Sequence, residues 1–129
     1  MDREQQVLLR RRLRAALRQQ PKIESLRALL LTIGGVEFVA PTGFDPDIAL
    51  LIDTGLTMAG SVKYEIMERS ESHKNAARLW LARESGLTGI GTGYALSSDG
   101  LWRQHSWGLR RAGILETTIK RVKYFGRTL

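Results

Sequence analysis

The stretch that decides the fold reads TGYALSSDGLWRQHSWGLRRAGILE over residues 92–116. Turn-forming residues at 97–100 and 110–113 separate segments in which the side chains alternate in character. The stretch therefore predicts successive antiparallel strands, and a further strand is expected to complete an antiparallel meander. The expected strand bounds are 89–94, 101–109, 114–118 and about 120–125.

The sequence before this stretch is predicted to be helical. Apolar residues recur at helical spacing between residues 3 and 19 and again between residues 23 and 33, and a glycine pair follows the second helix as a stop signal. These two helices are predicted to form a helical hairpin over residues 1–35. A central helix, rich in alanine and leucine, is predicted from Ser70 to Gly86. Because helices precede strands, we expect a single α+β domain over residues 1–129, with the central helix packed on the meander.

Two further expectations concern segments around the central helix. The pattern between residues 36 and 67 is weak, with a short strand at 36–40 and a short helix from Asp47 to Leu51, capped by Asp45 or Asp47. Glycines occupy alternate positions of the first meander strand, at 89, 91 and 93, which leaves one face of that strand bare. A bare face indicates close packing, for which we expect the central helix.

Length and composition limit the class of protein. The 129 residues suffice for one hydrophobic core. The chain has no cysteine and only two histidines, so neither a metal nor another cofactor is expected. No apolar run approaches the ~20 residues that span a bilayer. The N-terminal residues lack the pattern of a secretory signal, so a cytoplasmic location is expected.

The net charge of +7 is unevenly distributed along the chain. Residues 1–22 carry +5, residues 23–102 carry −4 and residues 103–129 carry +6. Arginines at 10–14 could contact the phosphates of a nucleic acid, but no aromatic residues are interleaved to stack bases. A solvated helix face is therefore favoured over a nucleic-acid site. The basic ends could equally fold back onto the acidic middle.

His105 and Glu116 are predicted to lie close together on neighbouring strands. If the turn pairs Leu109 with Ala112, Glu116 lies directly opposite His105, and if it pairs Leu109 with Ile114, Glu116 is the diagonal neighbour on the same face. An imidazole acting as a general base needs an acceptor that fixes its second nitrogen, which Glu116 would supply. The structural alternative is a half-buried packing histidine.

Ser72 is the candidate nucleophile. It stands near the start of the central helix, where free N–H groups and the positive end of the helix dipole favour a developing anion. A serine benefits less than a thiolate would, because its hydroxyl needs a base in direct contact. The structural alternative for Ser72 is a helix N-cap.

Several motifs together resemble the core of the papain-like and transglutaminase-like cysteine hydrolase superfamily. They are SHKNAARLW at 72–80, GYAL at 93–96, DGLWRQHSW at 99–107, ETT at 116–118 and YFG at 124–126. The similarity covers residues 70–126. In that superfamily a cysteine opens a helix, a histidine lies in the first strands after it, and an acid lies on the next strand. The resemblance implies Ser72 as nucleophile, His105 as base and Glu116 as orienting acid, with serine replacing the thiolate of the family.

Two function classes follow from the resemblance. The first is a hydrolase or acyl-transfer enzyme acting on an amide or thioester bond of a peptide or related substrate, active or inactive as the serine form. The second is a non-catalytic binding module of the same fold, whose basic ends contact an anionic partner. Trp102, Trp107 and Tyr94 are candidates to line a substrate groove, although a tryptophan on each face of one strand is more often a sign of packing on both sides.

Overall fold

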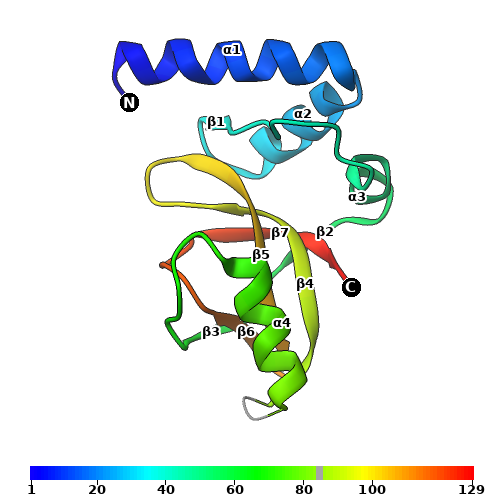
Figure 1. Ribbon diagram of the computed structural model, residues 1–129, viewed down its shortest axis with the longest axis vertical. Coiled ribbons are helices and arrows are strands. Elements are labelled where there is room, and N and C mark those ends of the chain that lie inside the picture. The colour runs from blue at the N-terminus through cyan, green and yellow to red at the C-terminus, as the bar shows by residue number, and fades with distance from the viewer. Residues whose placement is uncertain (84–85) are drawn as a thin grey trace.

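The computed structural model describes residues 1–83 and 86–129 and shows an α+β fold in which helices precede a mostly antiparallel, curled sheet (Figure 1). Six strands follow the order β2-β7-β4-β5-β6-β3, and the short β1 pairs in parallel with β5. The described helices are α1 (Arg3–Gln19), α2 (Ile23–Ile33), α3 (Ile48–Thr54) and α4 (Ser72–Ala82). The strands are β1 (Glu37–Phe38), β2 (Leu56–Met58), β3 (Ser61–Tyr64), β4 (Leu87–Leu96), β5 (Leu101–Arg110), β6 (Gly113–Glu116) and β7 (Lys123–Thr128).

The predicted N-terminal helices α1 and α2 are confirmed. Asp2 caps α1 through a capping box, because its carboxylate accepts from the Gln5 backbone N–H at 2.8 Å while the Gln5 side chain accepts from the Asp2 N–H at 3.1 Å. Gly34 ends α2 and donates its N–H to the Leu30 carbonyl. Figure 1 shows α1 lying along one end of the molecule, with α2 between it and the sheet.

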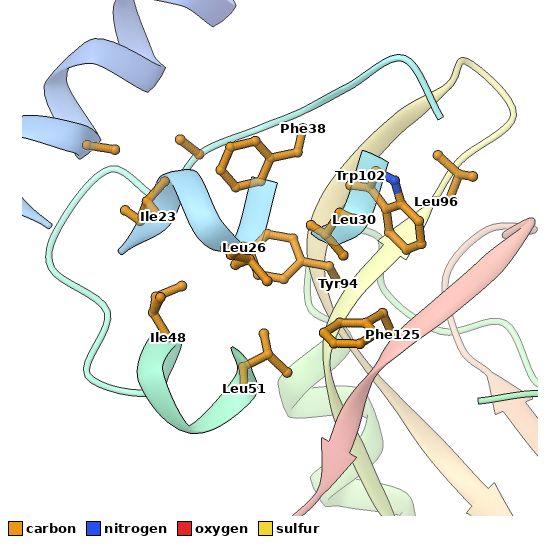
Figure 2. Close-up of a cluster of buried hydrophobic side chains, with 12 residues drawn as sticks. Ile23, Leu26, Leu30, Phe38, Ile48, Leu51, Tyr94, Leu96, Trp102 and Phe125 are labelled. Carbon is orange, nitrogen blue, oxygen red and sulfur yellow. The ribbon is translucent and has the colours of Figure 1, made fainter. Parts of the chain in front are cut away.

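The hydrophobic core has two parts on opposite faces of the sheet. One joins α2 and α3 to the sheet through Tyr94, Trp102 and Phe125, as Figure 2 shows. The other is built around Trp107 and Tyr124, and Met58 of β2 and Val62 of β3 pack against it. Because side chains from both edge strands meet around Trp107, this second face is the concave face of the curled sheet.

The final strand is not placed as predicted. Strands β4, β5 and β6 are successive antiparallel neighbours, as expected, but β7 pairs with β4, so the prediction that it continues the meander beside β6 is wrong. The chain turns away from the sheet after Glu116, and Val122 donates its N–H to the Leu96 carbonyl at the end of β4. Strand β3 occupies the place beside β6 in a parallel pairing.

The bare glycine face of β4 is covered by residues of the neighbouring strands, among them a tryptophan at Gly91, and not by the central helix. A Cβ atom on Gly91 would lie 2.2 Å from the indole nitrogen of Trp107. Helix α4 packs on the opposite face, where the His73 ring is hydrogen-bonded to Ser106 and Ser106 donates to Thr92. The expectation that the helix packs against the glycines is therefore wrong, since residues of the neighbouring strands β5 and β7 lie against them.

The ends of the shorter helices also differ from the sequence prediction. Helix α4 begins at Ser72 and ends at Ala82, with Arg83 in the left-handed conformation at φ 57°. The predicted extension to Gly86 includes residues 84 and 85, which lie outside the described residues. Helix α3 begins after Asp47 without a side-chain cap, and the carboxylate of Asp45 instead accepts from the Asp47 N–H.

Candidate functional site

His105 and Glu116 form a buried hydrogen-bonded pair on the concave face of the sheet. His105 Nε2 lies 2.8 Å from Glu116 Oε1 and 3.0 Å from Oε2, and the two residues are 1% and 0% exposed. Leu109 pairs with Ile114, which is the second of the two registers considered and makes Glu116 the diagonal neighbour of His105. The β5–β6 pairing ends at Gly108 and Leu115, so the two side chains meet where the strands have begun to separate.

The Glu116 carboxylate is surrounded by donors. Oε1 accepts from the Tyr124 hydroxyl at 2.8 Å, and Oε2 accepts from the backbone N–H groups of Thr117 and Thr118, both at 3.0 Å, and from the Thr118 hydroxyl at 3.1 Å. Burial raises the pKa of Glu116, but the His105 hydrogen bond and these donors outweigh it and hold the pKa below its usual value. The carboxylate is therefore ionised and can only accept hydrogen bonds.

The neighbouring carboxylate fixes the tautomer of His105. Burial lowers the pKa of His105, and the opposing effect of Glu116 does not restore it, so the ring is neutral at pH 7. Since Glu116 only accepts, the proton of the neutral ring is assigned to Nε2, and Nδ1 carries the lone pair. No described residue hydrogen-bonds to Nδ1. His105 also lines a pocket of about 650 Å³ although its side chain is buried, and a neutral imidazole is the protonation state that a general base requires.

Ser72 lines the same pocket. Among the described residues, no hydrogen bond joins its side chain to His105. Its Oγ accepts from the backbone N–H of Ser106 at 3.2 Å, a group left free because β6 has separated from β5 there. Glu71 occupies the N-cap position of α4 and Ser72 is the first helical residue. The serine therefore does not cap its own helix, and its hydroxyl proton is available for a further acceptor.

The three aromatic residues expected to line a substrate groove lie in the core. Trp102 and Trp107 are fully buried and Tyr94 is 1% exposed. The Trp102 indole donates to the Gly34 carbonyl at 2.9 Å, and Trp107 packs in the concave cluster. None of the three lines the pocket beside His105. The positions of Trp102 and Trp107 in separate core clusters fit the alternative of packing on both faces of β5.

Sequence reasoning missed several polar residues of the pocket. Arg121 reaches it from the loop after β6, and Arg103 and Ser97 reach it from β5 and the preceding turn. Tyr124 belongs to one of the motifs that carry the resemblance, and its hydroxyl donates to Glu116. The position of Arg103 two residues before His105, on the same strand face, was the available signal for that residue. For Arg121 no local pattern could reveal the approach.

Acid should destabilise the protein through this pair. As pH falls below about 6.5, histidine in the unfolded chain takes up a proton that buried His105 resists, so the unfolded state binds more protons and the free energy of unfolding falls. Glu116, whose pKa is also lowered, adds a second loss below about 4.5. Urea denaturation at pH 7.5 and pH 5.5 should show the first loss. Between the two pH values, the free energy of unfolding should fall less in the His105→Gln variant than in the unmodified protein. An equal fall would contradict the lowered pKa of His105.

No protein-family model matches the chain, and comparisons with curated proteins and with solved structures found no match either. Within residues 1–83 and 86–129, no helix is long and apolar enough to cross a membrane. The same residues contain no group of three or more histidine, aspartate or glutamate side chains arranged to hold a metal ion.

Proposed function

We propose that the pocket is the active site of a hydrolase or acyl-transfer enzyme of papain-like type, acting on an amide or thioester bond. The observation that carries the proposal is the buried pair of His105 and Glu116. Glu116 binds one ring nitrogen of His105, and His105 and Ser72 line the same pocket. A carboxylate that holds a neutral imidazole in a pocket shared with a candidate nucleophile supports activation of a hydroxyl or thiol.

The chemistry assigns one role to each residue. As Ser72 Oγ attacks the substrate carbonyl carbon, His105 Nδ1 takes the hydroxyl proton, and Glu116 stabilises the resulting imidazolium. His105 then gives that proton to the departing amine or thiolate, which leaves the acyl group on Ser72 as an ester. Water, or another nucleophile in an acyl transfer, releases the acyl group through the reverse sequence.

The Ser106 backbone N–H supports this role for Ser72. It already donates to Ser72 Oγ, so the oxygen can keep that hydrogen bond while its own proton turns toward His105. A donor that remains in place also favours the negative charge that develops on the oxygen. Close approach of the serine to the ring is expected on substrate binding, because catalytic hydrogen bonds are often long in the absence of substrate.

A fluorophosphonate probe tests the proposal on the unmodified protein. The activated serine should displace fluoride and gain the phosphonyl group, and peptide mass spectrometry should place the adduct on Ser72. His105→Gln should abolish labelling at that serine, whereas Ser98→Ala, a neighbouring serine outside the proposed triad, should retain it. Labelling spread over several serines at the same rate in His105→Gln would contradict the proposal.

A second candidate function is contact between α1 and an anionic partner, because α1 is exposed along most of its length. Ala16 is its one buried residue. Arg12 donates to the Ala40 carbonyl, whereas Arg10, Arg11 and Arg14 are exposed and form no ion pair with a described residue. In the basic C-terminal part, Arg103 pairs with Asp99 and Arg127 lies near Asp47, but other basic residues there also form no ion pair with a described residue. On α1 the unpaired arginines follow one another along a single exposed helix.

Salt dependence of nucleic-acid binding tests this second candidate. If α1 binds a duplex, the logarithm of the binding constant should fall with that of the salt concentration, with a slope of about 0.9 per phosphate contact. Replacing Arg10, Arg11 and Arg14 by glutamine should flatten that slope by about three units. Fluorescence anisotropy with duplex DNA provides the measurement, and Lys74, Arg78 and Arg83 changed to glutamine provide a charge-matched control. No binding at low salt would leave α1 as a solvated helix.

A further inference from the structure

The pocket beside His105 has a cationic wall formed by Arg103 and Arg121. Ser97 Oγ accepts from Nη1 of Arg103 at 3.1 Å and from Nη1 of Arg121 at 2.8 Å. Arg103 belongs to β5, Ser97 to the turn before it, and Arg121 to the loop between β6 and β7. Three separate segments thus bring two guanidinium groups to a single hydroxyl oxygen.

The Arg121 guanidinium is incompletely compensated within the protein. Its side chain is 9% exposed, and its Nε has no hydrogen-bond partner among the described residues. The nearest carboxylate oxygen, Glu116 Oε1, is 3.9 Å from that nitrogen and already accepts from His105 and Tyr124. Buried charged groups normally have their donors satisfied. The side chain is therefore held in a costly environment that an anion in the pocket would improve.

Donors of both arginines remain available to a ligand. Nη1 and Nη2 of Arg121 each carry two N–H groups, and the structure shows one contact from each, to Ser97 and Thr118. Arg103 uses Nη2 on Asp99 at 2.8 Å and shares Nη1 between Ser97 and Asp99. Since Ser97 Oγ is an acceptor in both contacts, its own proton is free to donate. A planar anion in the pocket could thus be bound by guanidinium and hydroxyl donors together.

The charge balance of the pocket indicates an anion with a single charge. Three arginines line it, including Arg69, which has no partner among the described residues. Two carboxylates lie beside these arginines, Asp99 at Arg103 and Glu116 at 3.9 Å from Arg121, so the positive charges exceed the negative ones by one while His105 is neutral. A carboxylate supplies one negative charge in a shape that matches the guanidinium fork. A doubly charged phosphate would exceed the balance.

We infer that Arg103, Arg121 and Ser97 form a carboxylate-binding subsite, so that the substrate carries a carboxylate close to the bond presented to Ser72. The identity of the bound molecule as a substrate rests on the proposed function. The preference of the pocket for a singly charged anion does not depend on it. Arg103 and Arg121 are then specificity-determining residues, and Arg69 adds attraction at the exposed side of the pocket.

Paired alkylating reagents of the same size test the subsite. Iodoacetate carries a carboxylate and iodoacetamide is neutral, and both react by attack of a thiolate on the CH₂ carbon with loss of iodide. In the Ser72→Cys variant the rate ratio of iodoacetate to iodoacetamide should be about tenfold higher than in Ala77→Cys, which places the thiol on the exposed face of α4. N-acetylglycine should slow the labelling by iodoacetate, and its neutral amide should not.

Matched arginine variants separate a local subsite from a general charge effect. Adding Arg103→Gln to Ser72→Cys should lower the ratio about tenfold, whereas adding Arg11→Gln, the same charge change on α1, should leave it unchanged. The Arg103 side chain is 40% exposed, so this variant is expected to fold. A ratio equal to that of Ala77→Cys, or one unaffected by Arg103→Gln, would overturn the subsite.

The two reagents also separate the subsite from the proposed function. Slow reaction with iodoacetamide together with a high ratio of iodoacetate to iodoacetamide rates would contradict the role of Ser72 as nucleophile and would still support the carboxylate subsite. Fast reaction with iodoacetamide together with the control ratio would support the nucleophile position and overturn the subsite.

Discussion

The Ser72→Cys variant is expected to react with iodoacetamide at pH 7 at least about tenfold faster than Ala77→Cys on the exposed face of the same helix. An unassisted thiol with a pKa near 8.5 is only a few per cent thiolate at that pH. At the start of α4, with the Ser106 N–H as a donor and His105 able to take the proton, the thiol should be largely ionised. Labelling reactions quenched at successive times and analysed by mass spectrometry give the two rates.

Two further variants in the Ser72→Cys background assign the effect to the pair. His105→Gln should return the labelling rate close to that of the exposed control, because the group that accepts the thiol proton is gone while an amide can still bond to Glu116. Glu116→Gln should slow labelling less, because the ring remains but its imidazolium form loses the neighbouring charge. Equal rates for Ser72→Cys and Ala77→Cys would favour the binding-module alternative.

Glu116→Ala should be among the most destabilising substitutions in the chain, with a loss of about 3–5 kcal/mol in the free energy of unfolding. The carboxylate is fully buried, and its removal leaves the His105 ring, the Tyr124 hydroxyl and the N–H groups of Thr117 and Thr118 without their acceptor. Urea denaturation at pH 7 measures the loss.

Glu37→Ala provides the comparison for this prediction. Glu37 forms a bidentate pair with Arg27, at 2.7 and 3.0 Å, but both side chains are more than 20% exposed. Water can replace the lost partner there, so a loss of about 1 kcal/mol or less is expected. Similar losses in the two variants would show that the buried network around Glu116 contributes little to stability.

The parts of the fold that sequence predicts are those specified locally. Helices α1 and α2 follow from apolar periodicity and nearby stop signals, and the β4–β5 hairpin follows from the turn at 97–100, where Asp99 accepts from the Leu101 N–H at 3.0 Å. The closeness of His105 to Glu116 belongs to the same class, since one short turn fixes which residues of β5 and β6 face each other.

The parts that sequence did not predict depend on contacts between distant segments. Alternation tells which face a side chain of β7 occupies, but not that the strand lies beside β4. Strands β2 and β3 are short and mostly exposed, so they lack the alternation that marks a half-buried strand. Arg121 enters the pocket because β7 returns to β4, so no local sequence pattern indicates this half of the cationic wall.

The position of β7 also determines when the sheet can form during synthesis of the chain. Within the part of the chain that the structure describes, residues 56–58 have no strand neighbour other than residues 124–126. One edge of β4 also pairs with this last segment. Tyr124 of that segment is also needed to complete the donors around Glu116. The helical hairpin can therefore fold early from local contacts, whereas closure of the sheet and assembly of the pocket must await emergence of β7 from the ribosome.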